Sequence, residues 1–536
     1  MHTCPRQKGG AAPGTDHSGT RNVIIAETTP DEATTRPEFH LDQTRAPLVE
    51  ALAAYRAANI TPFSTPGHKL GAGIAPELRE LYGIDALRSD IPVSGGVDDI
   101  HFRRQTLRQA EELGAAAWGA DRSFYLVNGS STGNHAFLLG TLRPGDKVIV
   151  ARDLHKSLLV ALIHTGAVPV YVAPRLHPEL NIGLGIDPGD VGAVLDAHPD
   201  AKLVALVSPS YCGIASDVRA IVAVAHRRGI PVYVDEAWGP HFPFHAAFPP
   251  AAMASGADGA VVSTHKMLGS ITQSAILHVK GSLIDLQRIE TAVGMAQTTS
   301  PAAFILASID ACRRQMVLYG RDLLERTLSL AHEARERLTA IPGISVLDGD
   351  GIGAVHWDPT QIMIDVHALG LTGFAVETLL REQFRIVPEM SDLLSIKCLI
   401  TIGDTPASID RLVTAFASIA AEHGQHRTRD EESELGAHLR SSGAVLAPGE
   451  QAMSPREAFF APSRVVPLAE AVGKVSAELV IPYPPGIPVL APGDVISPEK
   501  VEYLQFGAAQ GMYISGAADH RLATIRVVEL SRSTRA

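Results

Sequence analysis

Cysteine is scarce in this sequence, and its four copies are scattered. Cys4, Cys212, Cys312 and Cys398 are far apart among the 536 residues, and no two of them form a closely spaced pair. This arrangement excludes the disulfide framework of a small secreted protein and the paired cysteines of a zinc site. Isolated thiols suit a reducing compartment, so we expect a cytoplasmic protein without a metal centre.

Long apolar runs and tracts of one charge are missing as well. No window contains the roughly 18 uninterrupted apolar residues of a transmembrane helix, and the first residues lack the apolar core of a signal peptide. The formal charge is -12 without a long acidic tract, which argues against nucleic acids and anionic membranes as partners. This charge is compatible with a cationic small molecule as substrate.

The chain is long enough for two or three packed domains. It is 46% hydrophobic, and strand-like runs alternate with helix-like runs through its middle, which predicts an α/β fold. We expect a disordered arm over 1–40, a large domain over 41–300, a smaller α/β domain over 301–424, a linker over 425–450 and a small C-terminal domain over 451–536. In the smaller domain the pattern predicts a strand over 360–366, a helix over 374–382 and a strand over 399–402.

The most informative stretch is Val261-Val-Ser-Thr-His-Lys266. Its two valines are typical of the end of a buried strand, and Lys266 follows just beyond that end. In α/β folds, ligands bind in the crevice at the carboxyl ends of the strands. A partly desolvated lysine there has a lowered pKa and can form a Schiff base. Taken alone, the hexapeptide is equally compatible with a lysine on a surface loop.

A second strand end carries hydroxyl groups. The strand Phe124-Tyr-Leu-Val127 is followed by Asn128-Gly-Ser-Ser-Thr-Gly-Asn134 and then by an apolar helix. Backbone N–H groups at such a helix start, together with Ser130, Ser131 and Thr132, can hold an anion. The turn lacks the Gly-Lys-Ser/Thr ending of a Walker A loop. A capped helix without a ligand is the alternative interpretation.

Two more strand ends supply polar groups. His155 follows the strand Lys147-Val-Ile-Val150, and its aromatic face could cover a planar cofactor ring, although a structural histidine is the alternative. Asp235 follows the strand Pro231-Val-Tyr-Val234, where a buried acid requires a positive partner such as a protonated ring nitrogen. The stretch between Asp235 and Lys266 leaves room for one connection and one strand, so both side chains can reach the same crevice.

These parts together match the needs of one cofactor. Pyridoxal 5'-phosphate requires a Schiff-base lysine, an acid for its ring nitrogen and donors for its phosphate. Lys266, Asp235 and the hydroxyl-rich turn provide them, and Ser263 could add a further phosphate contact. The order and spacing of the parts indicate the cofactor more strongly than any single part does.

The sequence also resembles the Orn/Lys/Arg decarboxylase family, whose members are fold type I pyridoxal-phosphate enzymes. The resemblance covers roughly residues 45–520, and its matching segments are Thr65–His68, Asn128–Thr132, Asp153–Ser157, Val234–Gly239, Ser263–Lys266, Thr298–Pro301, Ile402–Thr405 and Pro482–Pro488. It implies a large domain with a mostly parallel seven-stranded sheet, a smaller α/β domain and a C-terminal α+β domain. It also implies decarboxylation of arginine, lysine or ornithine to a polyamine-type amine and CO2.

The resemblance assigns roles to particular residues. Lys266 would carry the Schiff base, Asp235 would pair with the ring nitrogen, His155 would stack on the ring, and His265 would lie beside the Schiff base. The remaining cofactor contacts that it implies are Ser130, Ser131, Thr132, Ala237 and Ser263. Thr298 and Thr299 would reach the cofactor of a neighbouring subunit in a homodimer or larger homo-oligomer, and a simple helix-capping role is the alternative.

Two departures from the family pattern affect these expectations. Large members carry an extra N-terminal receiver-like domain, whereas this chain has only the predicted arm and so resembles a short form. The segment Asp99–Arg104 stands where we expected proline and glycine, which could alter substrate recognition.

The sequence leaves the substrate and the reaction partly open. Acidic candidates for binding the distal charge of a basic amino acid are Asp98, Asp99, Glu236 and Glu389, and a solvated loop carboxylate is the alternative for each. With the same cofactor, an aminotransferase or an oxidative decarboxylase is an alternative reaction. A regulator that retains the fold without catalysis is the alternative class of function.

Overall fold

The computed structural model describes residues 41–93, 97–98, 106–177, 182–349, 355–423, 447–482 and 486–529. The predicted N-terminal arm, most of the predicted linker, and the segment Asp99–Arg104 lie outside these residues. No described helix is long and apolar enough to cross a membrane.

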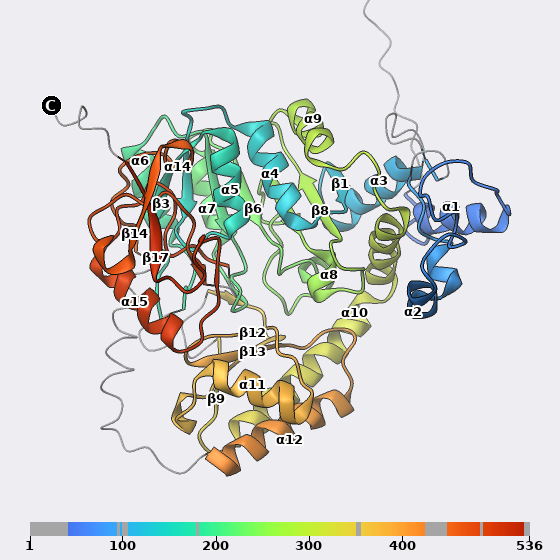
Figure 1. Ribbon diagram of the computed structural model, residues 1–536. Helices are drawn as coiled ribbons and strands as arrows, with labels where there is room; N and C mark the ends of the chain where they lie inside the picture. Colours follow the sequence, from blue (N-terminus) through green and yellow to red (C-terminus); the bar gives the residue numbers. More distant parts are fainter. Residues whose placement is uncertain are drawn as a thin grey trace, which may run out of the picture. The chain divides into compact units, whose positions relative to one another are not determined.

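A seven-stranded sheet forms the centre of the first part of the chain (Figure 1). Its strands, in spatial order, are β1 (Arg122–Leu126), β8 (Ala275–Val279), β7 (Gly259–Val262), β6 (Val232–Asp235), β4 (Leu203–Val207), β2 (Lys147–Ala151) and β3 (Val168–Val172). The pairs from β7 to β3 are parallel, and β8 runs antiparallel to both β1 and β7. The predicted mostly parallel seven-stranded sheet is therefore confirmed.

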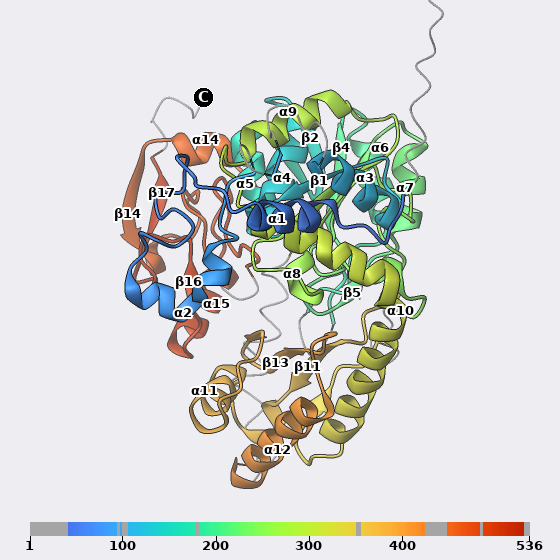
Figure 2. The same ribbon diagram turned by 90° about the vertical axis from the view of Figure 1, so that its right-hand side faces the viewer.

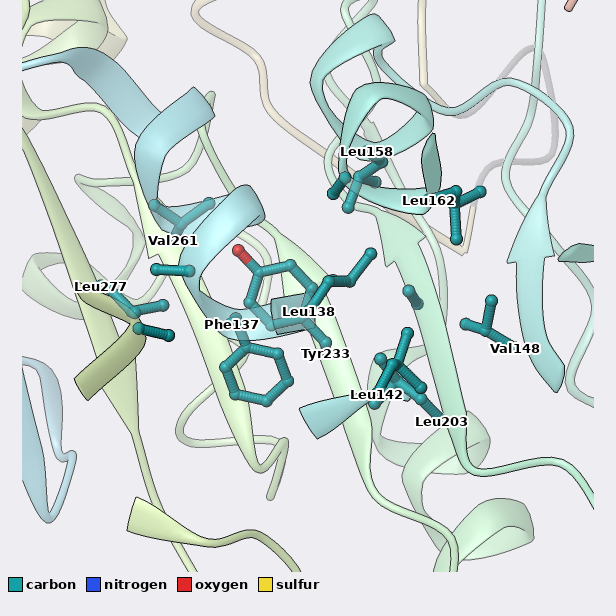
Figure 3. Close-up of a cluster of buried hydrophobic side chains, with 14 of the residues drawn as sticks. Phe137, Leu138, Leu142, Val148, Leu158, Leu162, Leu203, Tyr233, Val261 and Leu277 are labelled. Atoms are coloured by element: carbon teal, nitrogen blue, oxygen red, sulfur yellow. The ribbon is translucent and has the colours of Figure 1, made fainter. Parts of the chain in front are cut away.

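Helices cover both faces of this sheet, which explains why its strands are apolar throughout. One face packs against α4 (Gly129–Thr141), α5 (Lys156–Thr165) and α9 (Leu286–Ala296), and the other against α6 (Pro188–Ala197) and α7 (Val218–His226). On the first face the ring of Phe137 stacks on that of Tyr233 with 4.2 Å between centroids (Figure 3). Gly259 makes room for this pair, because a Cβ there would lie 2.1 Å from the Phe137 ring.

Further helices pack around the β1 edge of the sheet. They are α1 (Pro47–Ala57), α3 (Thr106–Trp118) and the long α10 (Ala303–Thr339). The helix α2 (Pro76–Leu87) is mostly exposed and buries Leu87. Leu48 at the start of α1 donates its backbone N–H to Asp310 Oδ2 on α10, at 2.9 Å. Figure 2 shows α10 running on from this region to a second sheet.

The second sheet has four strands, all paired antiparallel. In spatial order they are β12 (Met390–Ser391), β13 (Ser395–Leu399), β11 (Gln361–Asp365) and β9 (Ser345–Val346), with α11 (Gly373–Phe384) and α12 (Pro406–His423) packed on one face. A short pairing of β5 (Ile214–Ala215) with β10 (His356–Trp357) links this part to the first sheet.

The strand predicted over 399–402 is wrong in its bounds. The observed strand β13 begins at Ser395 and ends at Leu399. The chain turns there because Asp404 Oδ2 accepts the backbone N–H of Thr401 at 2.7 Å. A prediction based on apolar runs missed the start of this strand because Ser395 and Lys397 are polar.

The C-terminal part has its own small core. Its elements are α14 (Pro455–Phe460), β14 (Ser463–Pro467), β15 (Ile481–Pro482), α15 (Pro498–Ala509), β16 (Ile514–Ser515) and β17 (Thr524–Val528). Arg152, at the end of β2, forms a buried ion pair with Asp494 at 3.1 Å. The Gly486 carbonyl accepts the backbone N–H of Lys156 at 3.1 Å, which places Gly486 beside the start of α5.

Candidate active site

Lys266 lies on α8 (Thr264–Met267), a single helical turn directly after β7. Its Nζ is 3.9 Å from the centroid of the Trp238 ring. Burial lowers the pKa of the Lys266 amine, while the charges of Asp235 and Glu389 oppose that decrease. The lysine is therefore a desolvated amine at a strand end, as its sequence position predicted.

Asp235 is the last residue of β6 and is only 2% exposed. Its Oδ2 accepts a hydrogen bond from Asn134 Nδ2 at 2.7 Å, and its Oδ1 accepts the backbone N–H of Ala237 at 3.2 Å. Both oxygens are thus oriented by neighbours. The predicted contact residue Ala237 has a positioning role for Asp235 through its backbone.

Asn134 is a functional candidate that our reading of the sequence missed. Its Nδ2 also donates to Ser157 Oγ at 2.7 Å, and its Oδ1 accepts from the Tyr233 hydroxyl at 2.7 Å. Ser157 Oγ lies 2.8 Å from His155 Nδ1, so one chain of hydrogen bonds joins Asp235 to His155. The available signal was an amide directly before the apolar part of the helix.

His155 is the N-cap of α5, and its Nδ1 accepts the backbone N–H of Ser157 at 3.3 Å. Burial lowers the pKa of His155 to about 4, although the charge of Asp235 acts in the opposite direction. The imidazole is therefore neutral at neutral pH and carries its proton on Nε2.

The start of α4 presents the predicted hydroxyl-rich turn. Ser130 and Ser131 are half-buried, and the hydroxyl of Thr132 donates to the Asn128 carbonyl at 3.2 Å. The first turns of α4 pack on β7 so closely that a Cβ at Gly133 would lie 2.5 Å from Val261. Ser263 follows this strand, and among the described residues its buried Oγ has no hydrogen-bond partner.

His265 and the two threonines differ in position. His265 Nδ1 lies 2.8 Å from the Ser274 carbonyl, so this nitrogen is the donor, and burial lowers the pKa of the ring. Thr298 and Thr299 are exposed, and Thr298 Oγ1 accepts the N–H of Ser300 within the same turn. The capping alternative for these threonines is wrong, because α10 has Ala302 at its N-cap without a side-chain cap.

The described acids that could bind the distal charge of a basic amino acid differ in their contacts. Asp98 accepts the backbone N–H of Leu107, and the buried Glu236 accepts that of Ala252. Burial raises the pKa of Glu236 to about 8. Glu389 is solvent-exposed along part of its surface, yet its carboxylate is near enough to Lys266 and Lys397 for their charges to oppose the rise in pKa that burial causes.

Lys397, on β13, is a further residue that the sequence did not reveal. Its side chain is fully buried, and its Nζ is 3.7 Å from the centroid of the Trp238 ring. One indole ring thus contacts two lysine amines, those of Lys266 and Lys397. In the described part of the chain, no cluster of three or more potential ligands could hold a metal ion.

Comparisons with known proteins agree with this geometry. Residues 46–408 match the sequence model described as the Orn/Lys/Arg decarboxylase major domain, and residues 441–516 match the C-terminal domain of the same family. Arginine decarboxylases of Halalkalibacterium halodurans and Bacillus subtilis are 40% and 39% identical over 91% of this chain and cover 98% and 99% of their own lengths.

Solved structures with the same fold include two lysine decarboxylases. Lysine decarboxylase A from Pseudomonas aeruginosa superposes with a TM-score of 0.79 at 24% identity, over 90% of this chain and 80% of that one. The lysine decarboxylase of Francisella novicida gives a TM-score of 0.78 at 23% identity, over 91% and 82% of the two chains. These likenesses establish the fold.

Proposed function

The chain belongs to the Orn/Lys/Arg decarboxylase family, and from this premise we propose that it converts arginine to agmatine and CO2. Decarboxylation of a basic amino acid is the activity that unites the named relatives. We propose arginine as the substrate because the relatives of about 40% identity, which match this chain almost end to end, are arginine decarboxylases. The lysine decarboxylase of Pseudomonas aeruginosa is 26% identical.

We propose pyridoxal 5'-phosphate as the cofactor, and the residues present fit it. The unpartnered buried hydroxyl of Ser263 and the start of α4 would hold the phosphate, with Ser130, Ser131 and Thr132 contributing donors. When bound, this cofactor supplies an electron sink for the carbanion that remains after CO2 is lost.

Lys266 is the residue that would attach the cofactor. A lysine attacks an aldehyde only as the neutral amine, and burial next to Trp238 increases the neutral fraction. Substitution of this lysine by arginine would fail, because a guanidinium group stays protonated.

Asp235 and His155 would act together on the cofactor ring. Asp235, oriented by Asn134 and by the Ala237 backbone, would hold a proton on the ring nitrogen. His155 would cover one face of the ring. Because the pKa of His155 is lowered to about 4, its imidazole is neutral and does not repel that proton.

Lys266 is also the better candidate for returning a proton to Cα. His265 uses its Nδ1–H for the Ser274 carbonyl, and burial lowers the pKa of its ring. In the neutral ring, Nε2 therefore carries no proton to donate. We assign His265 to orienting the segment around the lysine.

Glu389 is the acid that we propose for the distal guanidinium. Asp98 and Glu236 already accept backbone N–H groups. Glu389 is exposed to solvent, and its charge acts on both Lys266 and Lys397, so it stands between solvent and the site.

We further propose a homodimer with shared active sites in the cytoplasm. The exposed Thr298 and Thr299, next to the exposed Met295, form a surface suited to a second subunit. Hydroxyl groups there would donate hydrogen bonds to a dianionic phosphate. Cys212, Cys312 and Cys398 are buried free thiols, which supports a reducing compartment.

The reaction is tested by supplying arginine, lysine and ornithine separately to the holoenzyme. We expect equal amounts of CO2 and agmatine from arginine, with kcat/KM at least about tenfold above that for lysine or ornithine. An aminotransferase would release a keto acid and no CO2. Equal efficiency on the three amino acids would contradict the preference for arginine.

A further inference from the structure

Lys397 is a fully buried lysine that faces the active site. In β13 its neighbours Ile396 and Cys398 belong to the core that α12 covers. Because side chains alternate along a strand, Lys397 points to the opposite face. There its Nζ lies 3.7 Å from the centroid of the Trp238 ring, which Lys266 Nζ contacts at 3.9 Å.

The described residues offer Lys397 Nζ no hydrogen-bond partner. The thiol of Cys212 is close, but burial raises its pKa to about 12, so it is uncharged and cannot serve as a counter-ion. Glu389 attracts the ammonium group electrostatically, and its backbone N–H donates to the Lys397 carbonyl at 2.9 Å. The amine itself remains without an acceptor.

Contact with an indole ring does not account for this burial. A desolvated cation–π contact offsets only part of the free energy that burial of an unpaired ammonium ion costs. Burial accordingly lowers the pKa of Lys397 to about 7, and the positive charge of Lys266 acts in the same direction. Buried polar groups nearly always have a hydrogen-bond partner, so an unpartnered buried amine at this site calls for an acceptor.

We propose that Lys397 binds the α-carboxylate of the amino acid substrate, a role that rests on the proposed function. With the cofactor held by Lys266, the substrate amine would have to lie beside the Lys266 amine. Its carboxylate is attached one carbon away, and Lys397 contacts the same indole ring as Lys266. A carboxylate there would accept the hydrogen bonds that Lys397 lacks.

This assignment also separates substrate from product. Loss of CO2 removes the only anionic group of arginine, so agmatine has nothing to offer Lys397. Lys397 therefore contributes to substrate affinity and does not hold the product. It acts as a binding residue for the reacting group.

The test compares a ligand with a carboxylate and a ligand without one. In the Lys397→Met holoenzyme we expect KM for arginine to rise about ten- to a hundredfold, as for loss of a charged hydrogen bond. The inhibition constant of agmatine should change less than about twofold. Lys202→Met, the same change at an exposed lysine, is the matched control and should alter neither constant.

Two results of this test would contradict the proposed role of Lys397. Equal weakening of arginine and agmatine, or no change in either, would overturn the role of Lys397. If Lys397→Met does not fold, Lys397→Gln provides a polar neutral replacement, with the same preferential loss of arginine expected. Absence of CO2 from wild-type protein with any basic amino acid would instead overturn the proposed function.

Discussion

Asn134 Nδ2 lies 2.7 Å from Asp235 Oδ2 and also 2.7 Å from Ser157 Oγ, so one amide joins the acid at the end of β6 to the start of α5. Through Ser157 the same network reaches His155. We assign Asp235 to the nitrogen of the cofactor ring and His155 to its face. Both are thus oriented by the network around Asn134.

The first prediction concerns this amide. Asn134→Ala should lower kcat about ten- to a hundredfold, because Asp235 and His155 lose their common support. It should also lower the free energy of unfolding by about 1–3 kcal/mol, since buried polar groups lose their partner. Steady-state kinetics and denaturant unfolding measure the two effects.

Thr141→Ala, on the same helix but away from the network, is the control for Asn134. Within the described part of the chain its hydroxyl donates to the Phe137 carbonyl and to no group of the network, so kcat should stay near the wild-type value. Unchanged kcat in Asn134→Ala would show that Asp235 and His155 do not need the amide.

The second prediction separates cofactor binding from catalysis. Asp235→Asn should retain the cofactor but lose at least about a hundredfold in kcat, because an amide cannot hold a proton on the ring nitrogen. Titration of the apoprotein with the cofactor and steady-state rates measure the two quantities. Activity within a few-fold of wild type would rule out Asp235 as the partner of the ring nitrogen.

The third prediction is a pH dependence of stability. Burial lowers the pKa of Lys397 from 10.5 to about 7. Between these values the unfolded chain binds a proton that the folded chain does not, so stability rises with pH across this window. Below about pH 7 both states are protonated, and the full cost of burying the charge is present.

Lys397→Met removes this dependence. Cys212, Glu389, Lys266 and Asp358, the other groups that act on Lys397, are the same in both proteins. In denaturant unfolding of the apoproteins, the stability advantage of the variant should be greatest near pH 6 and shrink towards pH 10. An advantage that grows with pH would show that Lys397 is not buried as a costly cation.

The fourth prediction tests shared sites. Lys266→Ala and the double variant Thr298→Ala/Thr299→Ala should each be inactive or strongly impaired alone. A mixed dimer contains one site with an intact Lys266 and intact threonines, so mixing should restore activity. Proven subunit exchange without any recovery would exclude a shared site.

Much of the fold was accessible from the sequence because its central strands are uninterrupted apolar runs. The strands around Val148, Val204 and Val234 are of this kind, and the polar residues that follow them marked the site. Lys266, Asp235 and His155 were found for that reason: each sits just after, or at the end of, such a run.

The missed residues have a common physical cause. Lys397 lies on a strand with two polar residues, a pattern that predicts an exposed edge. Its place at the site depends on contacts between distant segments, such as the pairing of β5 with β10. Asn134 lies in a helix start, where amides usually cap. Their roles depend on contacts between segments far apart in the chain, which local patterns do not encode.

The central claim is that this chain decarboxylates arginine through Lys266, and one measurement tests it most directly. Wild-type holoenzyme and Lys266→Ala are each supplied with arginine labelled in its carboxyl carbon, and released CO2 is counted while the visible absorbance of the bound cofactor is recorded. The account predicts CO2 in a one-to-one ratio with agmatine from the wild type, and neither CO2 nor the lysine-dependent absorbance from the variant. Release of CO2 by Lys266→Ala at the wild-type rate, or none from the wild type, would contradict it.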